Sequence, residues 1–270
     1  MVYFCATPLG NLGDITLRTL ETLRSVDLIF AEDTRRSRIL LNHYVIKKPL
    51  YRYDDHTEIE GSMLEQAMEE DKDMAIITDA GMPLISDPGY ELIQYCLKKE
   101  IPFEVQPGPS AVLLALSNSG LPSHRFSFMG FLPRKKKERL ELLEEIKERK
   151  ETLIFYETPH RIEKALEDLL TVFGNRQAAL LREMTKLYEE AIRLPLEDLI
   201  NEIKERPRKG EMVLVVQGWS EEPMDLPLED YLDEKLGKGY KTKEIATNIS
   251  KTYGITGSEA YKIVLERKKQ

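Results

Sequence analysis

The chain has 270 residues, of which 41% are hydrophobic and 32% charged, and it carries a net charge of -8. This is enough chain to bury a substantial core and to form about two domains. A mean hydropathy of -0.39 and the lack of a long apolar span exclude a transmembrane helix. Because the start, MVYFCATPLG, lacks the basic segment of a secretory signal, we expect a cytoplasmic protein with no membrane partner.

The first part of the chain alternates strand-like and helical patterns. This alternation predicts an α/β domain, in which helices cover a mostly parallel sheet. The predicted strands lie at 2–6, 28–31, 74–78 and 103–106, and the predicted helices at 17–24, 59–70, 90–99 and 111–117.

A second α/β domain is predicted after SNSGLPSHR (117–125), a segment rich in turn formers. The runs FSFMGF, TLIFYE, AALLRE and MVLVVQG predict its strands, and helices are predicted at 136–150, 161–172 and 196–206. We therefore expect one α/β domain over residues 1–118 and another over residues 119–219.

The last part of the chain, 220–270, predicts a linker and a small, basic helical module. The linker is SEEPMDLP (220–227), and amphipathic helices are predicted at 242–253 and 258–267. Residues 235–270 hold nine Lys or Arg against three Glu, a net charge of +6 on an otherwise acidic chain. Contact with RNA phosphates and a merely solvated tail explain this charge equally well, and a dimerisation role also stays open.

The cysteines and histidines do not form a metal-binding pattern. Cys5 and Cys96 lack the CxxC spacing of zinc and redox sites, so we expect buried, reduced thiols. The four histidines are scattered along the chain, and no metal site is predicted.

Three predicted strands are each followed by a loop rich in glycine and proline. The loops are TPLGNLGD, the segment within ITDAGMPLISDPGY, and QPGPSA, where Ser110 is a predicted helix cap. In an open α/β sheet, ligands bind outside the carboxyl ends of the strands, so these loops are expected to form one pocket. The sequence has neither GxGxxG nor GxxxxGK[ST], which argues against a conventional dinucleotide or ATP site.

Eight motifs give the chain a family resemblance from its first residues to about residue 217. They are ATPLGNLGDIT, AEDTRRS, TDAGMPLISDPG, QPGPSAV, GFLPR, FYETPHR, REMTK and KGEMVLVV. Together they resemble the tetrapyrrole methylase superfamily of S-adenosylmethionine-dependent methyltransferases, and within it the bacterial enzymes that methylate the ribose 2′-OH of a cytidine in 16S ribosomal RNA. The resemblance implies a homodimer whose two α/β domains hold the methyl donor in the cleft between them, without a metal.

The resemblance also implies which residues contact S-adenosylmethionine. In the first domain they are Pro8, Gly10, Asp79, Gly81, Met82, Pro83, Ile85, Asp87, Ser110 and Ala111, and in the second domain Tyr156, Glu157, Met184 and Thr185. The amino-terminal amides of the helix after Ser110 suit the carboxylate of the donor.

Methyl transfer to a hydroxyl also needs a group that receives its proton. The matched motifs offer Glu32, Asp33, Lys186 and Glu183, of which Lys186 and Glu183 are favoured. An ion pair between these two residues is the alternative explanation. Expected contacts with RNA phosphates are Arg35, Arg36, Arg134, Lys135 and Lys136, although surface salt bridges explain the first two comparably well.

Three functions are compatible with these motifs. The favoured one is a ribose 2′-O-methyltransferase whose partner is 16S rRNA or the small ribosomal subunit. The first alternative is a methylase of a carbon in a tetrapyrrole such as a corrin precursor, which would not need a basic tail. The second is a non-catalytic RNA-binding module, which would not need converging glycine-rich loops.

Overall fold

The computed structural model describes residues 1–54, 56–220, 228–237, 240–253 and 256–268. Contacts between its residues divide the chain into two compact units, Met1–Trp219 and Ser220–Gln270. The linker predicted at 220–227 lies, apart from Ser220, outside the described residues.

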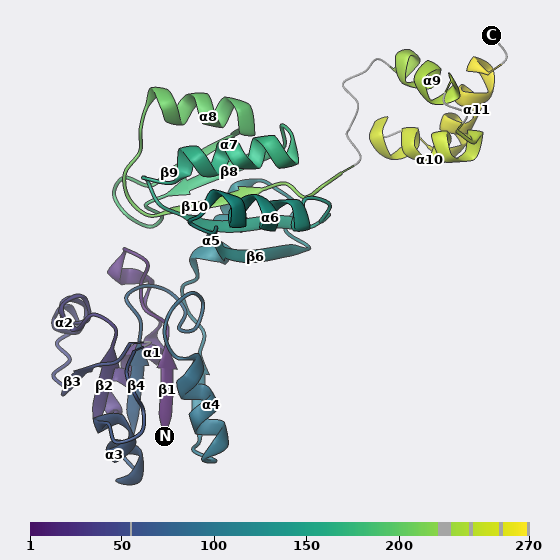
Figure 1. Ribbon diagram of the computed structural model, residues 1–270. Helices are drawn as coiled ribbons and strands as arrows, with labels where there is room; N and C mark the ends of the chain where they lie inside the picture. The colour runs from purple at the N-terminus through teal and green to yellow at the C-terminus, as the bar shows by residue number, and fades with distance from the viewer. Residues whose placement is uncertain (55, 221–227, 238–239, 254–255, 269–270) are drawn as a thin grey trace. The chain divides into compact units, whose positions relative to one another are not determined.

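The first sheet of the larger unit is fully parallel, as the alternating pattern predicts (Figure 1). Its strand order is β3-β2-β4-β1-β5. The strands are β1 (Val2–Cys5), β2 (Leu28–Ala31), β3 (Leu50–Arg52), β4 (Met74–Ile77) and β5 (Phe103–Gln106). The short edge strand β3 is absent from the sequence prediction.

Helices cover both faces of this sheet. Helices α1 (Leu17–Ser25) and α2 (Thr34–His43) pack on one face, and α3 (Met63–Glu69) and α4 (Tyr90–Lys98) on the other. The chain therefore leaves β1 toward one face and the adjacent β4 toward the opposite face. Such a switch point is where open α/β sheets bind ligands.

Two local features differ from the predicted helices. Helix α2 was not predicted, and it begins because the Asp33 side chain accepts a hydrogen bond from the amide of Arg35 at 2.8 Å. Helix α3 begins later than predicted, since Gly61 has a φ of +75° and Ser62 is the cap.

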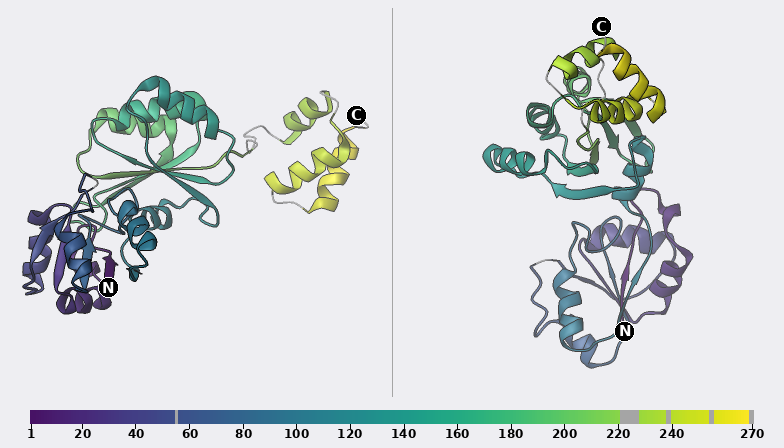
Figure 2. Two further views of the ribbon diagram at one scale, coloured as in Figure 1. Left: turned by 60° about the horizontal axis from the view of Figure 1, so that its bottom comes forward. Right: turned by 90° about the vertical axis from the view of Figure 1, so that its right-hand side faces the viewer.

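The second sheet is mixed, with strand order β6-β7-β10-β8-β9. Strands β6 and β7 pair in parallel, and the other neighbours are antiparallel. The strands are β6 (Phe126–Phe131), β7 (Thr152–Glu157), β8 (Gln177–Arg182), β9 (Glu190–Pro195) and β10 (Met212–Val216). Strand β9 was not predicted. Both views in Figure 2 show this sheet as a layer separate from the first.

One face of the second sheet carries α6 (Lys136–Ile146), α7 (Ile162–Phe173) and α8 (Leu196–Glu205). The opposite face packs against α5 (Ala111–Ser119), through Val112, Ala115 and Leu116. This helix follows β5 of the first sheet but contributes its apolar side chains to the core of the second. Its amino terminus, capped by Ser110 as predicted, therefore lies where the two sheets meet.

The smaller unit contains α9 (Leu228–Gly237), α10 (Thr242–Tyr253) and α11 (Gly257–Arg267). The predicted pair of helices is confirmed, and α9 is additional. Leu232, Ile245, Ile249 and Val264 are buried in a core of their own. Across the described residues, no helix combines the length and the apolar character needed to span a membrane.

Candidate functional site

A cavity of about 560 Å³ lies between the loops of the first sheet and the strand ends of the second. Loops after β1, β4 and β5 contribute Leu9, Ala80, Ile85, Ser86, Asp87 and Ala111. The second sheet and its loops contribute Phe131, Tyr156, Glu157, Thr158, Pro159, Glu183, Met184, Gly210, Glu211, Met212 and Val213. This volume suits a cofactor-sized ligand.

Two of the predicted loops are joined directly. The amide of Thr7 donates to the carbonyl of Gly81 at 3.0 Å, and the amide of Gly81 donates back at 2.9 Å. Gly81 has a φ of +86°, and a Cβ there would lie 3.2 Å from Cδ2 of Leu9. A residue without a side chain is therefore needed for the loops after β1 and β4 to meet.

Backbone strain is concentrated on both sides of the cavity. Leu84 and Ser86 have φ values of +71° and +65°, and Glu183 and Thr185 have values of +49° and +66°. Residues other than glycine rarely adopt a positive φ, and those that do cluster at ligand sites. Thr185 also accepts a hydrogen bond, at 3.1 Å, from the amide of Asn11 across the two sheets.

Tyr156 forms an aromatic part of the wall. Its ring packs edge-on against Phe128 and Phe131, with centroid distances of 4.8 and 5.5 Å. Burial, followed by the negative charges of Asp87 and Glu211, raises the pKa of Tyr156 to about 12. The phenol is therefore neutral at physiological pH and available as a hydrogen-bond donor.

Glu157 is a nearly buried carboxyl group on the same wall, with 2% of its surface exposed. Its Oε2 accepts a hydrogen bond from the amide of Thr158 at 3.0 Å. Its Oε1 lies 3.3 Å from Nη2 of Arg161, but forms no hydrogen bond within the described part of the chain. Burial outweighs both contacts and raises the pKa of Glu157.

The two favoured proton acceptors form an ion pair. Lys186 Nζ lies 3.1 Å from Oε1 of Glu183 and 2.9 Å from Oε2 of Glu211. Burial lowers the pKa of Lys186, but the hydrogen bonds to Glu211 and Glu183 outweigh it, so the pKa is raised overall. The pKa of Glu183 is lowered, because hydrogen bonds from the Glu211 amide and Lys186 outweigh burial. Lys186 is therefore a cation here, and Glu183 a carboxylate.

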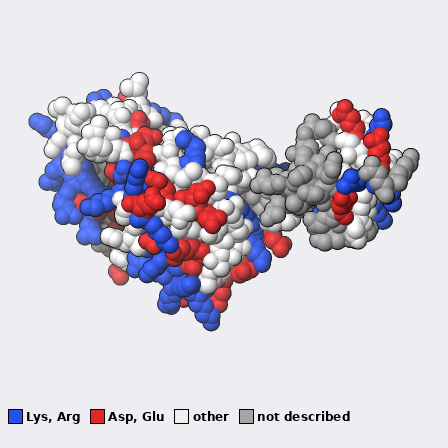
Figure 3. All heavy atoms as spheres, turned by 90° about the horizontal axis from the view of Figure 1, so that it is seen from above, with Lys and Arg blue, Asp and Glu red and all other residues white. Residues whose placement is uncertain are grey.

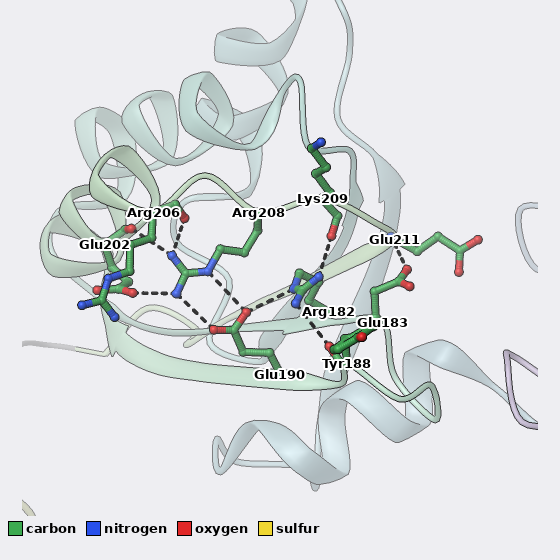
Figure 4. A network of polar contacts seen from close by, with 9 residues as sticks. All are labelled: Arg182, Glu183, Tyr188, Glu190, Glu202, Arg206, Arg208, Lys209 and Glu211. Atoms are coloured by element: carbon green, nitrogen blue, oxygen red, sulfur yellow. Dashed lines mark hydrogen bonds and ion pairs between the residues drawn. The ribbon is translucent and has the colours of Figure 1, made fainter.

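An ion-pair network holds the loop that leads into β10 (Figure 4). Arg208 lies between Glu190 and Glu202, at 3.0 and 2.6 Å. Arg182 contacts Glu190 at 3.1 Å and donates to the carbonyl of Lys209 at 2.8 Å. The network positions the adjoining cavity residues 210–213, because it ties this loop to β8, β9 and α8.

Four of the five predicted RNA contacts, Arg35, Arg36, Lys135 and Lys136, form ion pairs. Arg35 pairs with Asp33 at 2.8 Å, and Arg36 pairs with Asp79 at 3.1 Å. Lys135 pairs with Glu138 at 2.8 Å. On the face shown in Figure 3, acidic and basic side chains lie next to one another over much of the larger unit.

Six of the fourteen predicted donor-site residues line the cavity. Those lining it are Ile85, Asp87, Ala111, Tyr156, Glu157 and Met184, with Glu183. Pro8, Gly10 and Asp79 line a neighbouring cavity of about 130 Å³. Met82 and Pro83 share the loop after β4 but do not line either cavity.

Several lining residues were not assigned from the sequence. Among these unassigned residues are Leu9, Ser86, Thr158, Pro159 and the 210–213 segment. Most of them lie inside motifs that the sequence analysis identified, such as KGEMVLVV and FYETPHR. The glycine that precedes the strand in KGEMVLVV was the one sequence feature that pointed to residues 210–213. In the structure this residue, Gly210, has a φ of +97°.

The described residues contain neither a disulfide nor a metal-binding cluster. Cys5 and Cys96 are free and buried, as expected, and burial raises their pKa values to about 12 and about 11. The described residues contain no group of three or more His, Cys, Asp or Glu side chains placed to hold a metal ion.

Relatives with assigned names align with most of the chain. A protein named Ribosomal RNA small subunit methyltransferase I from Halalkalibacterium halodurans is 42% identical, over 97% of this chain and 93% of its own. A protein of the same name from Escherichia coli O157:H7 is 41% identical, over 98% and 95%. A third, from Thermotoga maritima, is 44% identical over 78% of this chain and 96% of its own.

Solved structures share the fold of the larger unit. A cobalt precorrin-4 methyltransferase superposes with a TM-score of 0.59 at 18% identity, covering 81% of this chain and 94% of its own. A diphthine synthase gives a TM-score of 0.61 at 15% identity, over 80% and 89%. The sequence profile of the family described as Tetrapyrrole (Corrin/Porphyrin) Methylases matches residues 1–200. The chain therefore belongs to the tetrapyrrole methylase family.

Proposed function

We propose that the protein transfers a methyl group from S-adenosylmethionine to the ribose 2′-OH of a cytidine in the 16S rRNA of the small ribosomal subunit. The observation that carries this proposal is 42% identity to a named rRNA methyltransferase over 97% of the chain. The structural likeness to the precorrin enzyme, at 18% identity, supports the fold alone.

The donor occupies the cavity of about 560 Å³. Met184, Met212 and Val213 are buried on its wall and offer an apolar surface to the adenosine. The backbone amides of Ser110 and Ala111, at the amino terminus of α5, hold the donor carboxylate, because a helix amino terminus favours a negative charge. Pro8 and Gly81 shape the backbone around the sulfonium end.

The reaction is an in-line displacement at a methyl group already activated by its sulfonium leaving group. Holding the ribose oxygen in line with that carbon supplies much of the rate, since orientation alone contributes on the order of 7–11 kcal/mol in well-aligned systems. Glu183 receives the hydroxyl proton, because it is ionised and lines the cavity. Lys186 keeps that carboxylate in place.

The protein acts in the cytoplasm as a homodimer. Leu187 and Tyr188 are 88% and 72% exposed beside the cavity loop, and they provide apolar surface that a second copy can cover. Light scattering after size exclusion is expected to give twice the 31.2 kDa mass of the chain. A single-chain mass at micromolar concentration would contradict the dimer.

The test of the activity is methyl transfer from labelled S-adenosylmethionine, offered in parallel to small ribosomal subunits, naked 16S rRNA and a tetrapyrrole precursor. The expected product is a 2′-O-methylated cytidine, identified by mass spectrometry after digestion of the RNA. Label on the tetrapyrrole alone would replace this function with the corrin-type alternative. No transfer, together with no heat of S-adenosylmethionine binding, would favour a non-catalytic module.

A further inference from the structure

An aromatic ring stands at the solvent side of the donor cavity. Phe131 lines the cavity, yet 50% of its surface is exposed. It ends β6 after a break in the register with β7, between Phe128 and Phe131. Gly130, within that break, has a φ of +64°. Irregularities of this kind turn a side chain out of the regular sheet pattern and are common beside active sites.

Two arginines hold the backbone that follows Phe131. Arg161 donates a hydrogen bond to the carbonyl of Leu132. Arg139 donates to the carbonyls of Pro133 and Arg134, at 3.0 and 3.3 Å. These hydrogen bonds restrain the backbone that follows Phe131.

Carboxylates fix the same two arginines. The guanidinium of Arg139 is buried against Asp168 at 2.6 Å. Arg161 is paired with Glu157, which itself lines the donor cavity. The segment after Phe131 is thus connected through Arg161 to the wall of the donor site.

Basic side chains follow the ring immediately. Arg134, Lys135 and Lys136 are exposed, and Lys136 lies 3.7 Å from Asp168 as its nearest ion-pair partner. An exposed aromatic ring next to exposed cations is the combination that proteins use for single-stranded RNA. The ring stacks on a base while the cations contact the phosphates.

The adenosine of the donor is a less suitable partner for Phe131. The deep wall already offers Met184, Met212 and Val213, which are 7%, 3% and 5% exposed. A purine enclosed there loses more water-accessible surface than one laid on a half-exposed ring. Phe131 is therefore available to contact a group that approaches from solvent.

We propose that Phe131 stacks on an unpaired base of the substrate RNA, while Arg134, Lys135 and Lys136 contact its phosphates, so that the ribose hydroxyl is delivered to the donor cavity. This assignment rests on the proposed function. It makes Phe131 a specificity residue for the acceptor rather than part of the donor site.

The experiment measures RNA affinity, S-adenosylmethionine affinity and steady-state methyl transfer for the full chain and four variants. Phe131→Ala removes the ring, Phe131→Tyr keeps it, and Phe131→Leu keeps apolar bulk without aromaticity. Phe126→Ala is the matched control, because Phe126 lies on the same strand, is 40% exposed and does not line the cavity.

The expected result is an RNA affinity about tenfold weaker in the Ala and Leu variants, the order expected for losing one base–aromatic stack. The Tyr variant and the Phe126 control keep the RNA affinity of the parent, and in the Ala and Leu variants the affinity for RNA falls more than the affinity for S-adenosylmethionine. Recovery by Leu, or weakened donor binding with unchanged RNA affinity, would overturn the assignment. Failure of the parent protein to bind or methylate the RNA would instead remove the proposed function itself.

Discussion

The side chain of Lys186 lies directly against the backbone of Gly10, so that a Cβ added to Gly10 would stand 2.3 Å from Cγ of Lys186. Gly10 follows β1 of the first sheet, and Lys186 follows β8 of the second. The contact therefore joins the two sheets next to the candidate donor site. The close contact also explains why position 10 is a glycine, since Gly10 does not have the positive φ that would otherwise require one.

Replacing Gly10 by alanine is expected to lower the free energy of unfolding by about 1–3 kcal/mol, the usual cost of overpacking. The added methyl group displaces Lys186 and disturbs its ion pairs with Glu183 and Glu211. Urea denaturation measures the change. In the double variant Gly10→Ala/Lys186→Ala, the steric part of the loss disappears, so the two substitutions are less than additive. Strict additivity would show that the contact carries no energy.

Gly81→Ala is expected to weaken S-adenosylmethionine binding at least tenfold, and Gly81→Asp to abolish it. The side chain would press on Leu9 and disrupt the pairing with Thr7 that brings two loops together. Placing any residue with a Cβ at position 81 also costs about 1–2 kcal/mol of stability, because the backbone φ there is +86°.

Gly61→Ala provides the matched control for that substitution. Gly61 has a similar φ of +75°, but no atom lies within 4 Å of its added Cβ. The control should lose comparable stability and keep its affinity for the donor in isothermal titration calorimetry. Equal donor affinities in the two variants would mean that Gly81 does not shape the donor site.

The sequence predicted the loops of the site better than the partners of its helices. Glycines and prolines mark the loops after β1, β4 and β5 directly, because few other residues tolerate such backbone paths. Helix α5 is different, since AVLLALSNS is apolar on more than one side. Nothing in that pattern indicates that Val112 and Leu116 pack on the second sheet instead of the first.

The sequence also failed to predict strands that are short or polar. Strand β3 has only three residues, and β9 reads EAIRLP, with two charged residues and a proline. The edge position of these strands explains both, because an edge strand is partly solvated and tolerates charge. Ion pairs such as Arg208 with Glu202 depend on tertiary contacts, so spacing along the chain did not predict them.

Glu157→Gln is expected to change how stability depends on pH. Burial raises the pKa of Glu157 above its ordinary value of 4.5, so the folded state binds this proton more tightly than the unfolded state. Ionisation then costs stability, and the free energy of unfolding of the parent falls relative to the Gln variant as pH rises from 4.5 through the raised pKa. Urea titrations across that range measure the difference.

Glu183→Gln should show the opposite sign in the same titrations. The pKa of Glu183 is lowered, so its carboxylate stabilises the fold above pH 4.5, and this contribution disappears as pH falls through the lowered pKa. Parallel curves for both variants would contradict the environments that the structure gives these two carboxyl groups.

Removing the residues after Ser220 is expected to leave donor binding intact and to weaken RNA binding. Residues 1–219 form a compact unit with their own cores, and the whole candidate donor cavity belongs to it. The relative from Thermotoga maritima matches 78% of this chain with 96% of its own length, so it has no counterpart for about a fifth of this chain. We therefore expect the tail to contribute to substrate affinity rather than to the chemistry.

The dependence of RNA affinity on salt separates a phosphate-binding tail from a solvated one. Each RNA phosphate that the tail neutralises steepens the slope of log affinity against log salt by roughly 0.7–0.9, so truncation should make the slope shallower. A full-length variant with Lys241, Lys243 and Lys262 replaced by alanine should show part of the same reduction, because these lysines are exposed in the described part of the tail. If the truncated chain, the lysine variant and the parent share one slope, the positive charge of the tail does not contact RNA, and only its solubility role remains.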